Sequence, residues 1–335
     1  MKSKKTIILF LILFSRIILS QDSLLIWETD LKNPTSVPIV LTEKNIFYSG
    51  LNGEIFCLDL NGNLLWKYDT FGTIYSTPVD EGELLAVSTY EGDLTSININ
   101  TGNLFQVIGI GEIVTSKNIL LIDIERDGIK VKAIIIGTEN GNLYCYDLYT
   151  LEQFWEKHIA EKPIVSSIIS SKQKIFFYDD EGTLYCVNGT NGLLIWKWKI
   201  PSKNPEPVFK TELIINHNNL YLVSPEGNIH CIDVMQGTEK WDLKKINASG
   251  LMTSDKNNLI VPTTKNKLLF ISTKTGKVEK EIELVPETKE NKVTELLVKK
   301  ENVFAGFENG LVYELSKNKG PVEIFRATNL PDGKE

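Results

Sequence analysis

Short apolar runs separated by tight-turn residues cover almost the whole chain. One run ends at a turn such as NG, EG or KN, a second run follows and ends in Asp or Asn, and a glycine-containing turn leads into a third. Runs of this kind, bounded by turn residues, predict β-strands. Helical periodicity is absent after residue 20. The pattern therefore predicts an all-β chain.

The strand pattern repeats seven times. The repeats are marked by turn residues 39 to 49 positions apart: Gly53, Gly92, Gly141, Gly182, Gly227, Asn266 and Gly310. One further apolar segment precedes every copy, so each unit contains four strands. A period near 40 residues with four strands per unit is typical of a β-propeller blade. Two β-sandwiches would not require such a repeat.

The complete units run from about residue 36 to residue 327, which predicts a single propeller of seven four-stranded blades. One extra outer-strand phrase, LLIWETDL at residues 24–31, precedes them. It could join the last blade and close the ring, or it could be the remnant of an eighth blade. Many runs are apolar at consecutive positions, as at residues 134–136, which suits sheets covered on both faces by neighbouring blades.

The N-terminus has the layout of a secretory signal peptide. Three lysines precede a short apolar run, and a small residue, Ser20, lies before a plausible cleavage point. We therefore predict a signal peptide at residues 1–20 and a propeller domain at 21–335, with a retained anchor as the alternative. Cleavage would change the net charge from −7 to −11, because residues 1–20 carry four positive charges and no acids. So acidic a chain is poorly suited to nucleic acid or anionic lipid. The mature chain is expected in the periplasm, cell envelope or extracellular space, with no membrane span.

Four cysteines occupy one position of the repeated phrase, in IFCLD, LYCYD, LYCVN and IHCID. Exported proteins often pair their cysteines, so two disulfides are conceivable. Equivalent positions on different blades should, however, lie farther apart than the roughly 7 Å that a disulfide spans between Cα atoms. We expect four buried free thiols.

The phrase resembles the tryptophan-docking repeat of quinoprotein-like (PQQ-like) β-propellers. Two copies match its spacing from small residue to tryptophan: Cys186, Asn188, Gly192, Trp196 and Cys231, Asp233, Gly237, Trp241. A third copy, from Cys145 to Trp155, has Leu151 in place of the glycine. The resemblance implies structural docking roles for Trp66, Trp155, Trp196, Trp241, Asp59, Asp147 and Asp233. Physically, the acid can bond turn amides, and the indole can bury a large apolar surface against the next blade.

A longer connection, ILLIDIERDGIKVKAIIIGTENG, distinguishes the third copy. Asp123, Glu125 and Asp127 have alternate spacing that could direct oxygens at one calcium ion, and the segment resembles a calcium-binding FG-GAP-type repeat. Lys130 and Val131 do not suit such a site. An ordinary solvated hairpin is the alternative.

The first strand of each blade lines the axial channel of a propeller. The candidate axial residues are Ser76, Thr77, Ser166, Ser167, Thr211, Glu212, Ser249, Thr294 and Glu295. They could bind a polar ligand, or they could simply be small polar residues that fit a crowded, hydrated axis.

Catalytic motifs are missing from the sequence. The three histidines fall on different repeats without metal-ligand spacing, and there is no GxSxG, HExxH or phosphate loop. Quinoprotein dehydrogenases carry a pair of adjacent cysteines beside their quinone. No two cysteines of this chain are adjacent in the sequence, so no PQQ cofactor is expected.

The chain resembles most the non-enzymatic propeller subunit of the bacterial outer-membrane β-barrel assembly machinery. That resemblance implies a monomeric binding or scaffolding module with a protein partner. The alternatives are a quinone- or calcium-dependent enzyme or sensor, and a calcium-stabilised extracellular adhesion module.

Overall fold

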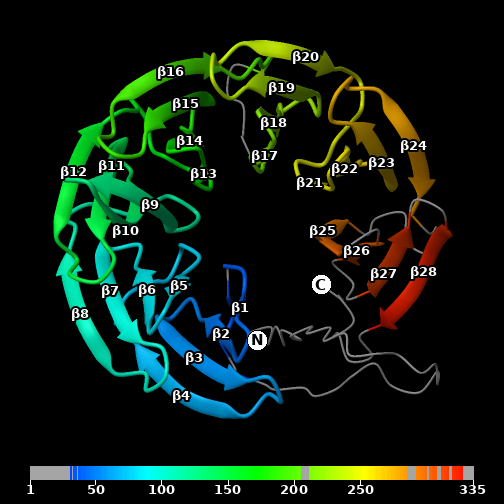
Figure 1. Ribbon diagram of the computed structural model, residues 1–335. Coiled ribbons are helices and arrows are strands. Elements are labelled where there is room, and N and C mark those ends of the chain that lie inside the picture. The colour runs from blue at the N-terminus through cyan, green and yellow to red at the C-terminus, as the bar shows by residue number, and fades with distance from the viewer. Residues whose placement is uncertain are drawn as a thin grey trace.

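Each repeat folds into one four-stranded antiparallel sheet, and seven sheets stand around a common axis (Figure 1). The computed structural model describes residues 31, 33–35, 37–204, 211–284, 292–299, 302–307, 311–316 and 319–326. The predicted all-β propeller of seven blades is confirmed, and the alternative of eight blades is wrong. The predicted signal peptide and residues 24–30 lie outside the described residues.

Strand order within every blade follows the sequence, from the axis outward. Blade 1 contains β1 (Val40–Leu41), β2 (Asn45–Ser49), β3 (Glu54–Asp59) and β4 (Leu64–Asp69). Blade 2 contains β5 (Val79–Glu81), β6 (Leu84–Ser88), β7 (Asp93–Asn98) and β8 (Leu104–Gly109). Blade 3 contains β9 (Leu120–Arg126), β10 (Ile129–Gly137), β11 (Asn142–Asp147) and β12 (Gln153–His158).

The remaining blades have the same plan. Blade 4 contains β13 (Ile169–Ser171), β14 (Lys174–Tyr178), β15 (Thr183–Asn188) and β16 (Leu194–Lys199). Blade 5 contains β17 (Ile214–Asn216), β18 (Asn219–Val223), β19 (Ile229–Asp233) and β20 (Glu239–Leu243). Blade 6 contains β21 (Thr253–Ser254), β22 (Asn258–Pro262), β23 (Lys267–Ser272) and β24 (Val278–Glu283). Blade 7 contains β25 (Val293–Lys299), β26 (Asn302–Phe307), β27 (Leu311–Ser316) and β28 (Lys319–Arg326).

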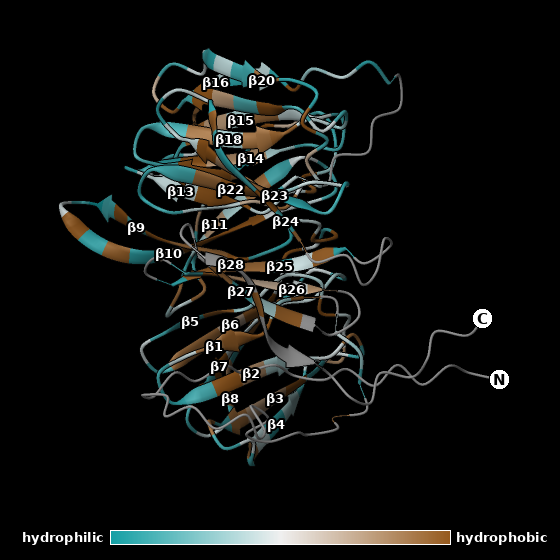
Figure 2. Cartoon of the chain, turned by 90° about the vertical axis from the view of Figure 1, so that its right-hand side faces the viewer, coloured by the Kyte–Doolittle hydropathy of each residue, from teal (hydrophilic) through white to brown (hydrophobic). Residues whose placement is uncertain are grey.

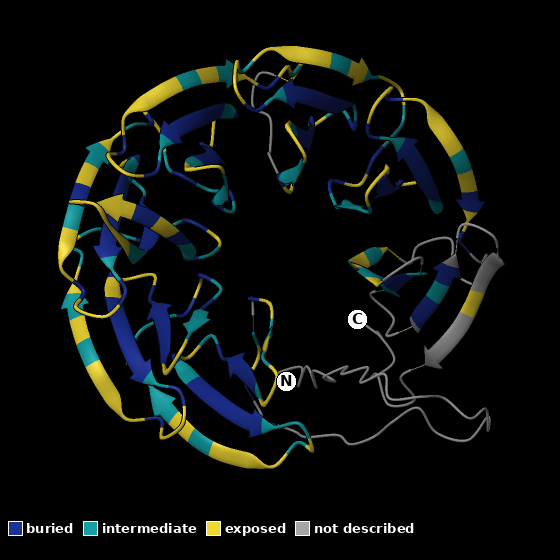
Figure 3. Cartoon of the chain, viewed as in Figure 1, coloured by how far each residue is buried: buried dark blue, intermediate teal, exposed yellow. Residues whose placement is uncertain are grey.

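The apolar core lies between blades. Six buried clusters each combine the two middle strands of one blade with those of the next; in one of them, Phe176 and Cys186 of blade 4 pack with Leu220 and Ile232 of blade 5. Both faces of a middle strand are covered, which explains why its sequence is a continuous apolar run. The outer strands alternate between exposed and half-buried residues (Figure 3).

Every outer strand pairs with its neighbour through a β-bulge. In blades 1–6 the register shifts at one equivalent place, for example between Cys57 and Leu58 in blade 1. A bulge bends a strand and re-aims the side chains that follow it. The repeated bulge therefore decides which outer-strand residues face the adjoining blade.

Blade 3 departs from the others. Its second strand, β10, has nine residues, and with β9 it forms a hairpin that projects from one face of the ring (Figure 2). The turn consists of Asp127 and Gly128, both with positive φ, as two-residue hairpin turns require. The ordinary hairpin is thus the conformation that the long third connection adopts.

No element of the described chain is a helix long and apolar enough to cross a membrane.

Candidate functional site

The hydroxyls of the axial segments are largely occupied by backbone. The Ser166 hydroxyl accepts a hydrogen bond from the Tyr178 N–H at 2.8 Å, and the Thr211 hydroxyl accepts one from the Val223 N–H at 2.8 Å. Both hydroxyls are buried. These bonds tie the segment before each first strand to the end of the second strand. They give Ser166 and Thr211 a structural role.

Blade 3 uses the same device, whereas the hydroxyl of blade 2 bonds to the neighbouring blade. The buried hydroxyl of Ser76 donates to the Ser116 carbonyl at 2.5 Å, and the Ser116 hydroxyl accepts from the Gly137 N–H at 3.1 Å. Ser116 lies in the apolar segment that precedes the third copy, at residues 114–122, but was not among the predicted axial residues. Its signal is a serine two residues after an apolar residue, as at Ser76 after Ile74 and Ser166 after Ile164.

The residue after each hydroxyl faces the centre of the ring. Thr77 and Ser167 are half-buried there, and Glu212 is exposed. Blade 3 places Lys117 at this position, and its N–H donates to the Ser166 carbonyl at 3.2 Å. Blade 7 places Glu295 there.

Three of these central residues interact electrostatically although their blades are not neighbours. Burial raises the pKa of Glu212, and the Glu295 carboxylate raises it further, whereas Lys117 lowers it. Burial also raises the pKa of Glu295. Both carboxylates are still accessible to solvent. Their pKa values are raised because neighbouring protein atoms crowd them within the channel, and not because water is excluded. The axis therefore brings together charges from blades 3, 5 and 7.

One predicted axial residue, Ser249, occupies another position. Ser249 follows Ala248, which bridges to Thr263 as Ile74 bridges to Thr89 in blade 2. That register aligns Ser249 with Tyr75 and makes Leu251 the central residue of blade 6.

Thr294 lies beside the axial carboxylate of its own blade. Its hydroxyl donates to the Gly306 carbonyl of the second strand at 3.3 Å, whereas the hydroxyls of Ser166 and Thr211 accept from a second-strand N–H.

The structure does not gather Asp123, Glu125 and Asp127. Asp123 and Glu125 lie on β9, opposite Lys132 and Lys130 in the register, and Asp127 lies in the turn. The Asp123 carboxylate forms an ion pair with the Lys132 ammonium at 2.9 Å. The geometry gives calcium no convergent set of oxygens at this place.

The predicted docking tryptophans each contact the next blade. The Trp66 indole N–H donates to the Ile99 carbonyl at 3.0 Å, and that of Trp196 donates to the Val234 carbonyl at 3.2 Å. Trp155 is buried in the cluster between blades 3 and 4, and Trp241 packs against the cluster between blades 5 and 6.

The turn acids begin the turn between the third and fourth strands of their blades, and in blade 5 the turn of Asp233 also contains Gly237, which contacts the Trp196 ring. The Asp59 carboxylate accepts hydrogen bonds from the Asn63 side-chain amide and from the backbone N–H groups of Asn63 and Asn61, and these bonds lower the pKa of Asp59. The carboxylates of two further acids accept in the same way within their own turns, Asp147 from Tyr149 and Thr150, and Asp233 from Met235 and Gln236.

The turn glycine and the docking tryptophan form a steric pair across each such interface. A Cβ atom on Gly102 would lie 2.7 Å from the Trp66 ring, and one on Gly237 would lie 2.5 Å from the Trp196 ring. Real Cβ atoms essentially never approach so closely. The glycine is needed because the indole lies against its backbone.

Each cysteine lies directly opposite a docking tryptophan in its own blade. The pairs are Cys57 with Trp66, Cys145 with Trp155, Cys186 with Trp196 and Cys231 with Trp241. All four cysteines are buried and free, as predicted. Burial raises the pKa of the first three thiols to about 12 and that of Cys231 to about 11, so they stay protonated and unreactive at neutral pH.

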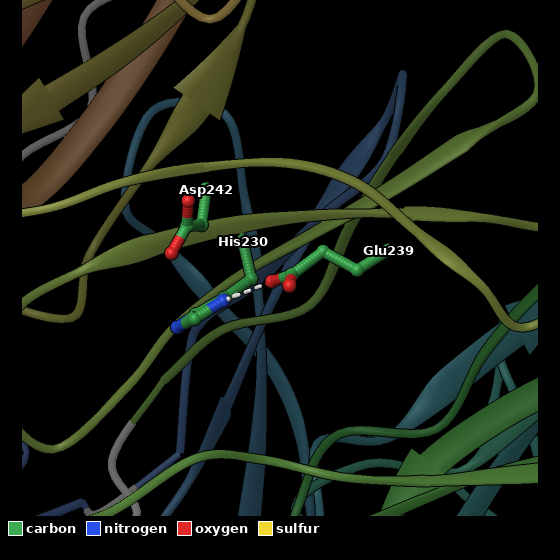
Figure 4. Close-up of side chains that lie close together, drawn as sticks. All are labelled: His230, Glu239 and Asp242. Carbon is green, nitrogen blue, oxygen red and sulfur yellow. Dashed lines mark hydrogen bonds and ion pairs between the residues drawn. The ribbon is translucent and has the colours of Figure 1, made fainter.

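A cluster of three metal-ligating side chains was missed in the sequence. His230, Glu239 and Asp242 of blade 5 bring potential ligand atoms within 4.8 Å of one another (Figure 4). The spacing in the sequence looks irregular, because the β-bulge adds one residue between the two acids.

Exposed aromatic residues lie in two adjoining loops, the connection from blade 1 to blade 2 and the turn between β6 and β7 of blade 2. Phe71 is 90% exposed and has a positive φ of 58°, while the exposed rings of Tyr75 and Tyr90 lie 5.8 Å apart. The two loops are fixed to each other, since the Tyr90 N–H donates to the Thr73 carbonyl and the Glu91 carboxylate accepts from the Thr73 N–H. The aromatic patch is defined here as Phe71, Tyr75 and Tyr90.

Comparison with known proteins places similar chains in two groups. Outer membrane protein assembly factor BamB of Shewanella oneidensis is 23% identical over 255 residues, which cover 72% of this chain and 61% of that protein. The Beta-alanine-activating enzyme of Drosophila melanogaster is 29% identical over 161 residues, which cover 46% of this chain but only 15% of the enzyme. The chain thus spans less than two thirds of either relative.

The solved structures support the fold. The crystal structure of BamB from Moraxella catarrhalis superposes with a TM-score of 0.69 at 15% identity and covers 87% of each chain. The family model described as Outer membrane protein assembly factor BamB matches residues 17–105 and 139–329. The unmatched stretch contains the projecting β9–β10 hairpin. These matches span most of the ring, and the chain belongs to the PQQ-like propeller family described as Outer membrane protein assembly factor BamB.

Proposed function

We propose that this chain is an exported, non-enzymatic propeller that binds a protein partner as a scaffold in outer-membrane protein assembly. Family membership supports this function, because the matched family and the Shewanella relative are both described as an outer membrane protein assembly factor. The predicted N-terminal signal peptide supports export to the cell envelope.

The aromatic patch is the observation that carries the binding role. A soluble protein rarely exposes neighbouring aromatic rings unless they contact another molecule. Tyrosine and phenylalanine are also enriched where proteins bind each other. The positive φ of Phe71 costs backbone strain, which persists where the surrounding structure enforces it and often marks a functional position.

An affinity experiment tests this role. The mature protein, immobilised and incubated with envelope extract, should recover one partner in stoichiometric amount, and the variant Phe71→Ser/Tyr75→Ser/Tyr90→Ser should lose it. Phe105→Ser is the matched control, because Phe105 is 58% exposed but lies on the outer strand β8. Equal recovery by the triple variant, or no stoichiometric partner at all, would contradict the proposal.

A quinone-dependent enzyme is the second candidate. Membership of the PQQ-like propeller family supports the quinone, and the match to the Beta-alanine-activating enzyme, which covers 15% of that enzyme, supports only that a similar segment occurs in an enzyme. Lys117, Glu212 and Glu295 could hold a polar ligand at the axis. Absorption spectroscopy after incubation with PQQ and calcium tests this candidate, and a bound quinone spectrum that Glu212→Gln abolishes would favour it over the scaffold.

A further inference from the structure

The β-bulge of blade 5 places three ligand-type side chains on one side of the sheet. Asp242 lies directly opposite His230 in the register, whereas Glu239 lies opposite Ile232. Residues three apart on a regular strand face opposite sides. The extra residue at the bulge, Lys240, brings Glu239 and Asp242 to the same side instead.

The chemistry of the cluster suits a transition-metal ion. One imidazole nitrogen and two carboxylate oxygens lie within 4.8 Å of one another, and the His230 Nδ1 is 2.5 Å from a Glu239 oxygen (Figure 4). His230 is buried, but the side chains of Glu239 and Asp242 are 35% and 32% exposed, so an ion can enter from solvent. Three protein ligands with water in the fourth position form a common zinc arrangement.

The surroundings of the ring fix its orientation. The His230 ring lies 5.6 Å from the Trp198 ring of blade 4, measured between centroids. Its second nitrogen, Nε2, is buried and has no hydrogen-bond partner. The ring can therefore reach a ligand from solvent only through Nδ1. Nδ1 faces the Glu239 carboxylate, and a cation held between them would be shared by both.

The fold does not need histidine or acidic residues at these three positions. Blade 1 carries Phe56, Lys67 and Leu64 where blade 5 carries His230, Asp242 and Glu239. The ligand set is therefore an addition to the blade plan.

We propose that His230, Glu239 and Asp242 form a binding site for a divalent transition-metal ion of the zinc type. Calcium is disfavoured, because it prefers six to eight oxygen ligands and the cluster offers a nitrogen and two carboxylates. The Lys244 ammonium forms an ion pair with the Asp242 carboxylate at 2.9 Å, so it competes with the metal ion for this ligand. The site crosslinks β19 and β20 and is independent of partner binding.

Calorimetric titration of the full chain with zinc chloride, in a buffer free of chelators, tests the proposal. The wild-type protein should bind one zinc ion per chain, and calcium in excess should not displace it. Loss of one of three ligands in His230→Phe or Glu239→Gln should weaken binding by at least about tenfold. Lys244→Gln should strengthen it, because the competing cation is removed.

Two variants guard against trivial outcomes. His230→Phe copies the residue of blade 1 and should keep the fold, and Glu239→Gln alters a part-exposed side chain without changing its shape. Asp123→Asn, in the projecting hairpin, is the control for a lost surface acid and should bind zinc as the wild type does. Absence of zinc binding by the wild type, or undiminished binding by both ligand variants, would overturn the proposal.

Discussion

The interface between blades 1 and 2 and that between blades 2 and 3 solve the same packing problem in opposite ways. At the first, Trp66 of blade 1 covers the turn of blade 2, and the turn residue is Gly102. At the second, the equivalent outer-strand residue of blade 2 is Gln106, and the turn residue of blade 3 is Leu151. Leu151 is buried and belongs to the cluster between these blades.

The difference shows that the two positions form one unit across the blade boundary. Where an indole covers the turn, only glycine leaves room for it. Where the indole is missing, a leucine side chain fills the space from the opposite side, although it must adopt a positive φ of 52°. The departure of the third repeat from the family pattern is thus a compensation for the missing tryptophan of the second repeat.

Removing a docking tryptophan should cause the largest loss of stability. Trp196→Ala removes the indole packing and its hydrogen bond to the Val234 carbonyl, and we expect a loss of roughly 3 kcal/mol in the free energy of unfolding. Gln106→Ala, at the same position of blade 2, should change it by less than about 0.5 kcal/mol. Urea denaturation followed by circular dichroism measures both. Equal losses would show that the two interfaces do not differ as described.

Filling the turn of a docked interface should cost somewhat less. Gly237→Leu gives blade 5 the residue that blade 3 tolerates, but its Cβ would lie 2.5 Å from the Trp196 ring. Overpacking and backbone strain together should destabilise the chain by about 2–3 kcal/mol. The same substitution combined with Trp196→Ala is the internal control, because part of the clash then disappears. If the double variant loses the full sum of both single losses, the steric pairing is wrong.

Transplanting the docked pair should show coupling of smaller size. Gln106→Trp alone should clash with Leu151, and Leu151→Gly alone should leave a cavity, whereas the double variant should recover part of both losses. A favourable interaction energy of about 1 kcal/mol is expected from the double-mutant cycle. Additive losses in urea denaturation would indicate that the blade 2–3 interface cannot accept an indole.

Contacts that recur from repeat to repeat could be predicted from the sequence, whereas individual contacts that depend on residues of two different repeats could not. Turn glycines, tryptophans and cysteines recur in register, so repetition alone identified them. Leu151 could be noticed as a departure, but its cause lies 45 residues earlier at Gln106 and becomes adjacent only in the ring. His230 and its two acids escaped because the bulge breaks the alternation on which sequence reasoning relies.

The axial residues show a second limit of sequence reasoning. The apolar segments were aligned with the first strands, but in blades 2, 4, 5 and 6 the predicted axial residues lie in the segment that precedes the first strand. Small shifts within these segments decide which residue faces the axis. Lys117 and Leu251 were missed for that reason, whereas Glu212 and Glu295 were identified. Each of the seven blades contributes one central residue, so the net charge at the axis depends on placing all seven of these residues correctly.

Unlike the docked interfaces, which stabilise the ring, the axial carboxylates should destabilise it at neutral pH. Of the predicted effects, theirs should be the smallest. Burial and the Glu295 carboxylate raise the pKa of Glu212 in the folded chain, so the protonated form is favoured by folding. The associated stability is present at low pH and is lost as the pH rises through the folded-state pKa. Glu212→Gln should therefore raise the Tm at pH 7, by no more than about 2 °C, and the gain should vanish near pH 4. Thermal unfolding between pH 4 and pH 8 measures this, with Glu152→Gln on an exposed turn as the control. A lower Tm at pH 7 would mean that Lys117 outweighs burial and repulsion, and that the axis, like the docked interfaces, holds the ring together.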